Sequence, residues 1–248
     1  MEWRLIIDEA HDAYTNMAID YALLKLNKQP VLRLYKWKPP AVSIGYFQSL
    51  NDEIDTEKCE ELGVDYVRRI TGGGAVFHDH ELTYSVTINE DNEFIPMDLN
   101  DSYSDICSAV ILGLGELGLK ADYVPLNDII VNGRKISGCA QTRKEKKILQ
   151  HGTLIMDVDV DRMFSVLKVP SEKIRDKLIS DVRQRVTSIN QELGKDISYM
   201  ELCRSLKNGF EKKFSIVLKE SPISKEEAAL AEKIKKEQFS NPEWNKRR

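Results

Sequence analysis

The sequence predicts an α+β fold in one domain, with a helical C-terminal portion packed on it. Strand-like alternation of apolar and polar side chains dominates the first two thirds of the 248 residues, and helical periodicity dominates from about residue 159 onward. No repeat or low-complexity linker separates the two parts. A chain of this length buries a sizeable core without disulfides or a structural metal. We therefore expect residues 1–248 to form a single domain.

The first elements follow from the spacing of apolar residues. A helix is expected to begin at Thr15 or Asn16, either of which can cap it, and to end at Leu26. Residues 31–37 alternate in polarity as a strand does, and the Lys-Pro-Pro sequence after them ends this strand. Residues 41–47 resume as a second strand, which we expect to lie beside the first.

The later elements are marked by glycine and by polar turn residues. A short helix over residues 55–62 is expected to end at Gly63, since glycine readily adopts the left-handed conformation of a helix C-terminus. Asn132-Gly133 predicts a hairpin turn. The other expected strands cover residues 64–69, 82–88 (half-buried), 135–140 and 148–156, and the other expected helices cover 102–117, 161–167, 172–179, 198–210 and 225–238.

Composition and charge exclude several classes of protein. The 36 basic and 40 acidic residues give a net charge of −4, which argues against a general nucleic-acid binder. Residues 1–133 carry 10 basic and 23 acidic side chains, whereas residues 134–248 carry 26 and 17, so the second half suits an acidic partner or phosphates. The four cysteines are widely spaced and indicate neither a zinc site nor a disulfide framework. We find no signal peptide or membrane-spanning run, and expect a cytoplasmic protein that binds no membrane.

A glycine cluster follows one of the expected strands. Gly72, Gly73 and Gly74 let backbone amides approach an anion closely, since no Cβ intervenes. Arg68 and Arg69, just upstream, add positive charge with bidentate geometry for phosphate or carboxylate. The pattern matches neither the dinucleotide-binding nor the P-loop fingerprint. A tight hairpin turn is the plain alternative.

A second polar cluster surrounds Lys135, at the entry to an expected strand. A lysine at this place suits an anionic partner, although an exposed lysine on a strand edge would need none. Asp128 could hold a magnesium ion together with water and phosphate oxygens. Alternatively, Asn127 and Asp128 form a turn.

Four motifs, in this order, resemble those of the lipoate–protein ligases, and the likeness extends over essentially the whole chain. They are RRITGGGAVFHD at residues 68–79, NDIIVNGRKISGCAQ at 127–141, HGTL at 151–154 and RQRVTSI at 183–189. The resemblance implies a fold shared with biotin ligases, a central mixed β-sheet with flanking helices. It also implies that ATP and magnesium activate lipoate or octanoate to an acyl-adenylate, from which the acyl group passes to a lysine. The implied acceptors are lipoyl domains, of a 2-oxoacid dehydrogenase E2 or of the glycine cleavage H protein.

The same motifs imply the residues of the site. Lys135 would be the catalytic residue, in contact with the acyl carbonyl and α-phosphate oxygens, and Asp128 would bind magnesium. A compact ammonium neutralises charge on the phosphate during activation and on the oxyanion during transfer. His78 and His151 are expected to position substrate, unless each is a structural histidine. The implied substrate- and nucleotide-binding residues are Arg69, Thr71, Gly72, Gly73, Gly74, Ala75, Val76, Phe77, His78, Lys135 and His151.

Two features of the expected site have a plain structural alternative. The acyl chain needs an apolar tunnel, for which Val42, Ile44, Tyr46 and Val86 are candidate walls, although core packing is the favoured explanation for each. Cys139 is expected to be a packing residue, and a nucleophilic role would need a low thiol pKa, to which Lys135 and Arg143 could contribute. The basic run over residues 143–147 is either a solvated turn or a docking surface for an acidic acceptor domain.

Two other functions are compatible with the motifs. A related branch consists of octanoyltransferases, which take the acyl group from acyl carrier protein through a cysteine in an insertion before the lysine-bearing strand. This chain has neither the insertion nor a cysteine between Leu126 and Lys135, which favours the ligase. Many ligases also need an accessory domain or a separate small subunit for activation. The chain alone could therefore be partner-dependent, or a non-catalytic lipoate-binding subunit.

Overall fold

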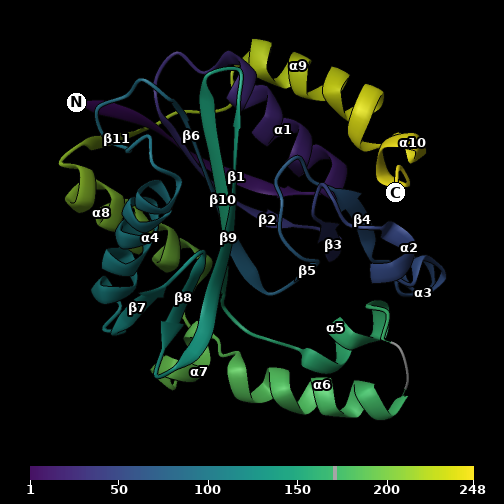
Figure 1. Cartoon of the computed structure of the whole chain (residues 1–248). Coiled ribbons are helices and arrows are strands. Elements are labelled where there is room, and N and C mark those ends of the chain that lie inside the picture. The colour runs from purple at the N-terminus through teal and green to yellow at the C-terminus, as the bar shows by residue number, and fades with distance from the viewer. Residues whose placement is uncertain (170–171) are drawn as a thin grey trace.

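The computed structural model describes residues 1–169 and 172–248, which are built around one large sheet (Figure 1). This sheet has eight strands in the order β11-β1-β2-β6-β10-β9-β8-β7. β1 pairs in parallel with β11 and β2, and the remaining neighbours pair antiparallel, so the predicted mixed sheet is confirmed. The strands are β1 (Glu2–His11), β2 (Val31–Trp37), β6 (Glu81–Asn89), β7 (Ala121–Val124), β8 (Asp128–Val131), β9 (Arg134–Lys144), β10 (Lys147–Ile155) and β11 (Val217–Glu220).

A second, three-stranded sheet has the order β4-β3-β5. Its strands are β3 (Ala41–Ile44), β4 (Asp65–Arg68) and β5 (Val76–His78), and the short helices α2 (Leu50–Glu53) and α3 (Thr56–Leu62) follow β3. The prediction that β3 lies beside β2 is wrong, because both edges of β2 are occupied by β1 and β6. β3 pairs with β4 and β5 instead.

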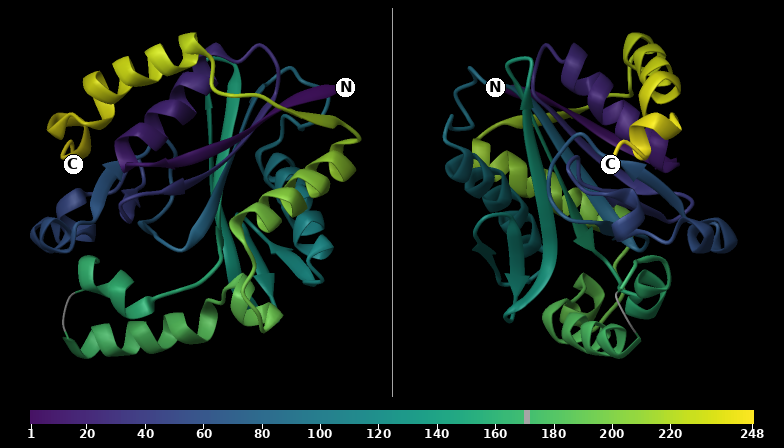
Figure 2. Two further views of the ribbon diagram at one scale, coloured as in Figure 1. Left: turned by 180° about the vertical axis from the view of Figure 1, so that it is seen from behind. Right: turned by 45° about the vertical axis from the view of Figure 1, so that its right-hand side comes forward.

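Helices cover both faces of the large sheet (Figure 2). α4 and α8 pack on one face, and α1 packs on the other with α9 against its outer side. α4 and α8 approach closely at Gly209, where an added Cβ would lie 2.3 Å from the carbonyl oxygen of Ala109. The largest apolar core fills the space between the sheet and α4 with α8. These helices are α1 (Ala13–Leu26), α4 (Leu99–Glu116), α8 (Tyr199–Phe214) and α9 (Lys225–Ile234).

The remaining helices lie at the edges of the molecule. α5 and α6 form a pair away from the large sheet, at the bottom of Figure 1, and α10 follows a π-helical turn that continues α9. No helix in the described part of the chain is long and apolar enough to cross a membrane. The bounds are α5 (Val160–Val166), α6 (Glu172–Arg185), α7 (Ile189–Leu193), the π-helical turn η1 (Lys235–Phe239) and α10 (Pro242–Asn245).

Three predictions of local structure are corrected. The first helix is capped by Asp12 rather than by Thr15 or Asn16, because the Asp12 carboxylate accepts the backbone N–H of Thr15. The expectation of a half-buried β6 is wrong, since helices cover both sides of the sheet and side chains on both faces of this strand are buried. The C-terminal part is not wholly helical, because β11 adds an edge strand beside β1.

A buried ion cluster ties β1, β2 and α1 together. Arg33 on β2 is fully buried, and its guanidinium lies 2.8 Å from an oxygen of Asp8 and 2.8 Å from an oxygen of Asp20. Arg33 also donates to the side-chain oxygen of Asn16 at 2.8 Å, and the Tyr35 hydroxyl donates to Asp20 at 3.0 Å. Each charged group therefore has a partner, as buried charges require.

Acid is expected to weaken this cluster through Asp8. Burial raises the pKa of the Asp8 carboxyl, but the hydrogen bond from His11 and the charge of Arg33 outweigh it and lower the pKa to about 2. A carboxyl with a lowered pKa stabilises the fold above its unfolded pKa of about 4, and this contribution of about 2 kcal/mol is lost as the pH falls toward 2. We expect the urea midpoint to fall between about pH 4 and pH 2, and to fall less in Asp8→Asn. Equal pH dependence of the two proteins would contradict this role.

Candidate functional site

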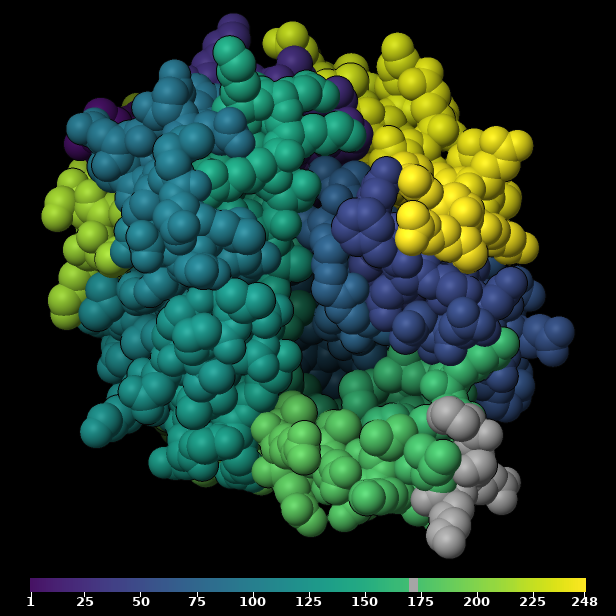
Figure 3. Space-filling model, in the orientation of Figure 1, coloured from purple at the N-terminus to yellow at the C-terminus, as the bar shows by residue number. Residues whose placement is uncertain are grey.

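One cavity brings most of the predicted residues together. It has a volume of about 380 Å³ and is bounded by β9, the glycine loop before β5, and α5 with α6, where Figure 3 shows a deep hollow between the teal, blue and green surfaces. Thr71, Gly72 and Asp128 each bond to a residue of the lining. The predicted residues that line the cavity are Arg69, Gly73, Gly74, Ala75, Val76, Phe77, His78, Lys135 and His151.

The apolar walls of the cavity differ from the prediction. Val42 and Ile44 belong to the core of the small sheet, Val86 belongs to the core under α4, and Tyr46 packs edge-on against Trp244. None of the four therefore lines the cavity, and the favoured core interpretation is confirmed for Val42, Ile44 and Val86. The actual apolar walls come from α1, β2, β10, α5, α6 and the segment after α6, and include Met17, Trp37, Ile155, Met163, Val182 and Val186.

Arg69 holds the glycine loop from the inside. Its Nη2 donates to the carbonyl oxygens of Gly72 and Gly74 at 2.7 Å each, and its Nε donates to the Thr71 hydroxyl at 3.1 Å. Its Nη1 donates to the carbonyl of Ser43 on β3 at 2.9 Å. Burial lowers the pKa of Arg69 to about 10, so the guanidinium stays charged near neutral pH. Arg69 thus shapes the loop, and its direct contact with a nucleotide stays a prediction.

The Arg68 side chain binds the C-terminal segment and is not available to a phosphate. Its guanidinium donates to the carbonyls of Gln48 at 2.6 Å and Asn245 at 2.9 Å, and its backbone N–H donates to the Asn245 side chain at 2.7 Å. The Trp244 indole donates to the Arg68 carbonyl at 2.8 Å. The prediction of a phosphate-binding cation at this position is therefore wrong, because these contacts use the arginine to dock α10 on β4.

Lys135 and Asp128 form an ion pair at the mouth of the cavity. The Lys135 Nζ lies 2.7 Å from Asp128 Oδ1, and the two side chains are 40% and 32% exposed. An added Cβ at Gly138 would lie 2.9 Å from this Nζ, so glycine leaves the room in which the lysine side chain lies. The ammonium is therefore held in place and remains within reach of a bound molecule.

His151 links the glycine loop to α1 through buried hydrogen bonds. Its Nε2 lies 2.8 Å from the Thr71 hydroxyl and its Nδ1 lies 3.4 Å from Asp20. Since the Asp20 carboxylate can only accept, the neutral ring carries its proton on Nδ1 toward that carboxylate, and Nε2 accepts the proton of the Thr71 hydroxyl. Burial, the largest cause, lowers the pKa of His151, in keeping with a neutral ring. His151 therefore positions Thr71 and, through it, Arg69.

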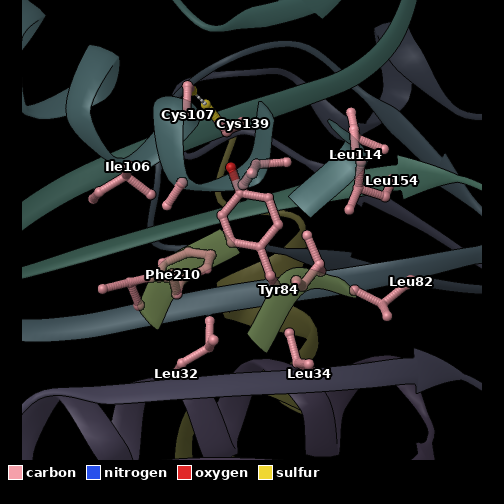
Figure 4. Close-up of a cluster of buried hydrophobic side chains, with 14 of the residues drawn as sticks. Leu32, Leu34, Leu82, Tyr84, Ile106, Cys107, Leu114, Cys139, Leu154 and Phe210 are labelled. Atoms are coloured by element: carbon pink, nitrogen blue, oxygen red, sulfur yellow. Dashed lines mark hydrogen bonds between the residues drawn. The ribbon is translucent and has the colours of Figure 1, made fainter. Parts of the chain in front are cut away.

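Cys139 belongs to the core, as expected for a packing residue. It neighbours Gly138 and Ala140 on β9, and alternate residues of a strand point to opposite faces. Its sulfur lies 3.6 Å from that of Cys107 on α4, inside the apolar cluster around Tyr84 and Phe210 in Figure 4. The hydrogen bond with Cys107, followed by burial, raises the pKa of the Cys139 thiol well above its usual value. A thiolate nucleophile is therefore disfavoured at this position.

For three polar residues of the site, the sequence gives little or no indication that they belong to it. Asp20, Ser43 and Glu81 have exposed fractions of only 1%, 2% and 6%, and each bonds to a histidine that lines the cavity. Asp20 has a weak signal, since an acid within the apolar run of the first helix needs a buried partner. Ser43 has none, because serine is common in strands and its partners lie far along the chain.

The basic run over residues 143–147 covers the end of β9, the turn at residues 145–146 and the start of β10. Lys147 donates to the carbonyls of Lys25 at 2.8 Å and Asn27 at 3.2 Å, and Arg143 donates to the Ser102 hydroxyl at 3.2 Å. These contacts agree with the turn interpretation. A docking role for the run stays a prediction.

Comparison with known proteins identifies the family. The family model of the lipoyl protein ligase A/B catalytic domain matches residues 12–211. Octanoyltransferase LipM of Brevibacillus brevis is 37% identical over 274 aligned positions, covering 100% of this chain and 99% of that protein. A bi-partite lipoate protein ligase of Thermoplasma acidophilum, solved in a study that included its E2 lipoyl domain, has a TM-score of 0.91 at 33% identity, covering 99% of this chain and 96% of that one. A lipoate-protein ligase A bound with ATP has a TM-score of 0.86 at 30% identity, covering 99% of each chain.

The names of these proteins differ on the reaction that each one catalyses. The curated relative is named an octanoyltransferase, which agrees better with the octanoyltransferase alternative than with the ATP-dependent ligase that the motifs favour. The two structural neighbours are named ligases. The family model itself covers most of this sequence. The chain is therefore an enzyme of the lipoyl protein ligase A/B catalytic domain family.

Proposed function

We propose that the chain transfers an octanoyl or lipoyl group from an activated donor to the ε-amine of a lysine on an acceptor lipoyl domain. The observation that carries this proposal is the Lys135 ammonium, fixed by Asp128 at the mouth of an apolar-walled cavity. The apolar walls suit a medium-length acyl chain, which would place its carbonyl beside the ammonium. The acceptor amine then approaches from solvent.

Lys135 has two tasks in this reaction. Its charge polarises the acyl carbonyl, and it stabilises the oxyanion that forms when the acceptor amine adds to the carbonyl carbon. The amine loses a proton, the tetrahedral intermediate collapses, and the leaving group departs as the amide forms. The ion pair at 2.7 Å keeps the ammonium in one place before the acyl group arrives, so little reorganisation is needed.

The favoured donor is an acyl-adenylate. A cysteine-thioester route needs an accessible thiolate, and all four cysteines of the chain are buried. Cys139 borders the cavity, but its thiol faces Cys107 in the core. An adenylate needs no enzyme nucleophile, and backbone amides of residues 73–76 with the Lys135 charge suit its phosphate.

Making the adenylate from ATP would require magnesium. Asp128 is a single carboxylate already paired with Lys135, and the described residues contain no group of three or more side chains that could hold a metal. Asp128 would therefore bind magnesium only together with phosphate oxygens and water. Bound there, the ion would neutralise phosphate charge.

A thioester donor is the second candidate, favoured by the name of the Brevibacillus relative. In that case an octanoyl group on acyl carrier protein would pass directly to the acceptor amine, with Lys135 in the same role. The alignment with that relative spans 274 positions, whereas this chain has 248 residues, so the relative has at least 26 residues without a counterpart here. This difference agrees with the absence of the cysteine-bearing insertion from the present chain.

The experiment compares the two donors on one acceptor. We would incubate a purified lipoyl domain with the chain and either synthetic octanoyl-adenylate or octanoyl-acyl carrier protein, and record the intact mass of the acceptor. We expect one octanoyl group from the adenylate, with an unchanged rate in Cys139→Ser. Transfer from acyl carrier protein but not from the adenylate would overturn the adenylate proposal, and its loss in Cys139→Ser would assign a thioester intermediate to that thiol.

A separate arm of this experiment supplies ATP, lipoate and magnesium in place of a preformed acyl donor. The Thermoplasma neighbour is described as a bi-partite ligase, and we propose that this chain likewise depends on a separate small subunit for activation. We expect the chain alone to use the adenylate but not ATP. Efficient lipoylation from ATP by the chain alone would show that no such subunit is needed.

The packing of the glycine loop on β3 predicts a strong effect of Gly45→Ala. The added Cβ would lie 2.0 Å from the carbonyl oxygen of Gly73, so the loop must move away. A shift of about 1 Å in a positioning group can lower a rate by about 10²-fold, and we expect a loss of that order in acyl transfer. Gly115→Ala on α4 is the matched control, since its Cβ would meet nothing within 4 Å. A normal rate in Gly45→Ala would show that the loop position is unimportant.

A further inference from the structure

Ser43, His78 and Glu81 form a hydrogen-bonded triad in the wall of the cavity. The Ser43 Oγ lies 2.7 Å from His78 Nε2, and His78 Nδ1 lies 2.7 Å from Glu81 Oε1. All three residues line the cavity although each is at least nine-tenths buried. Serine, histidine and an acid in this order are the arrangement of serine hydrolases, which recurs on unrelated folds and is identified by its geometry.

The junction of the two sheets brings these residues together. On β3 and β5, Ala41 pairs with His78, so Ser43 lies two residues further along the same face of β3. Glu81 is the first residue of β6, directly after the turn that leads from the small sheet to the large one. The strands therefore hold the three side chains of the triad on three separate segments.

The surrounding hydrogen bonds fix the direction of the triad. The Trp37 indole donates to the Thr83 hydroxyl at 2.7 Å, and that hydroxyl donates to Glu81 Oε1 at 2.7 Å. Glu81 then accepts from the Nδ1–H of His78, which leaves Nε2 free to accept the Ser43 proton. The Trp37 ring stacks on the His78 ring with centroids 4.0 Å apart and an interplanar angle of 13°, so the imidazole cannot turn away.

A charged donor also reaches the hydroxyl oxygen of Ser43. Arg69 Nη1 lies 3.2 Å from Ser43 Oγ, in addition to its bond to the Ser43 carbonyl. A fixed positive charge at this distance favours the alkoxide that forms as the proton leaves. The proposed amide formation at Lys135 assigns no proton transfer or bond-forming step to any of the three triad residues.

We propose that Ser43 is a second nucleophile, which accepts medium-chain acyl groups from activated esters or thioesters and releases them by hydrolysis. Ser43 Oγ attacks the carbonyl carbon while His78 Nε2 takes its proton. The bond from the carbonyl carbon to the leaving oxygen or sulfur breaks, and the leaving group takes that proton. Water then attacks the Ser43 ester with His78 as base, which releases the carboxylic acid and restores the serine hydroxyl.

The test measures release of p-nitrophenol from p-nitrophenyl octanoate by the full chain, without acceptor domain or nucleotide. We expect Ser43→Ala to lower the rate to that of buffer, and Glu81→Gln to lower it by up to about 10⁴-fold. Ser205→Ala is the matched control, since this buried serine on α8 donates to the Leu202 carbonyl at 3.0 Å and does not line the cavity, and it is expected to keep the full rate.

Labelling of the unmodified chain makes the outcome independent of how the variants fold. A fluorophosphonate probe, followed by digestion and peptide mass analysis, should mark Ser43. Absence of label on Ser43, or an esterase rate that Ser43→Ala leaves unchanged, would overturn the proposal. The assay involves neither acceptor nor adenylate, so its failure would leave transfer at Lys135 untouched, and failure of that transfer would leave this proposal standing.

Discussion

Replacing Lys135 by leucine is expected to lower acyl transfer to the acceptor lysine by at least about 10³-fold, with little change in stability. The ammonium is the charge that faces the reacting carbonyl in the proposed mechanism, and leucine cannot stabilise an oxyanion. The side chain is 40% exposed, so its replacement leaves no core cavity, and its pairing with Asp128 is worth little in stability. We would measure the single-turnover rate from octanoyl-adenylate and the urea midpoint of the same preparation.

Lys144→Leu is the matched control for this prediction. Lys144 lies on the same strand, β9, and is exposed, but it stands over the Tyr21 ring away from the cavity mouth. The Lys144→Leu enzyme should transfer the acyl group at the normal rate. A Lys135→Leu variant that transfers as fast as Lys144→Leu would remove Lys135 from the mechanism.

Replacing Arg33 by methionine should lower the free energy of unfolding by about 3–5 kcal/mol. Methionine fills most of the volume but leaves the Asp8 and Asp20 carboxylates without their cation, and Asp20 is 1% exposed. Burial raises the pKa of Asp20, but His151 and Arg33 outweigh it and lower the pKa overall, so the carboxylate is charged at neutral pH. Urea unfolding followed by circular dichroism at pH 7 gives the difference.

Arg183→Met provides the comparison at the surface. Arg183 lies 2.6 Å from Asp161, but the two side chains are 55% and 70% exposed, so water replaces the lost contact. We expect a change below about 1 kcal/mol. If the two variants lose similar amounts of stability, burial is not what makes the Arg33 cluster important.

Local signals in the sequence predict much of the fold. β2 matches its predicted range because Pro39 and Pro40 end an alternating run, and α3 ends at Gly63, whose φ of 63° is left-handed. Such local signals do not show which strands pair when the two strands lie far apart in the sequence. β11 lies among helices in the sequence and is stabilised as a strand by β1, from the other end of the chain.

The site likewise combines residues that the sequence identifies with residues that it does not. Lys135 and the glycine loop are identified by their motifs, and both lie at one cavity. The groups that hold them, Asp20 behind His151 and Ser43 beside Arg69, come from α1 and β3. Sequence spacing carries no signal for such contacts, since each is made by the packing of separate elements.

Intact mass of an acceptor lipoyl domain after incubation with the purified chain and lipoyl-adenylate tests the proposed reaction most directly. A matched acceptor, in which the target lysine is replaced by arginine, controls for uncatalysed acylation of other amines. We predict a gain of one lipoyl group on the unmodified acceptor, none on the arginine acceptor, and none with the Lys135→Leu enzyme. An acceptor that stays unmodified by the wild-type chain, or is modified equally by Lys135→Leu, would contradict acyl transfer at Lys135.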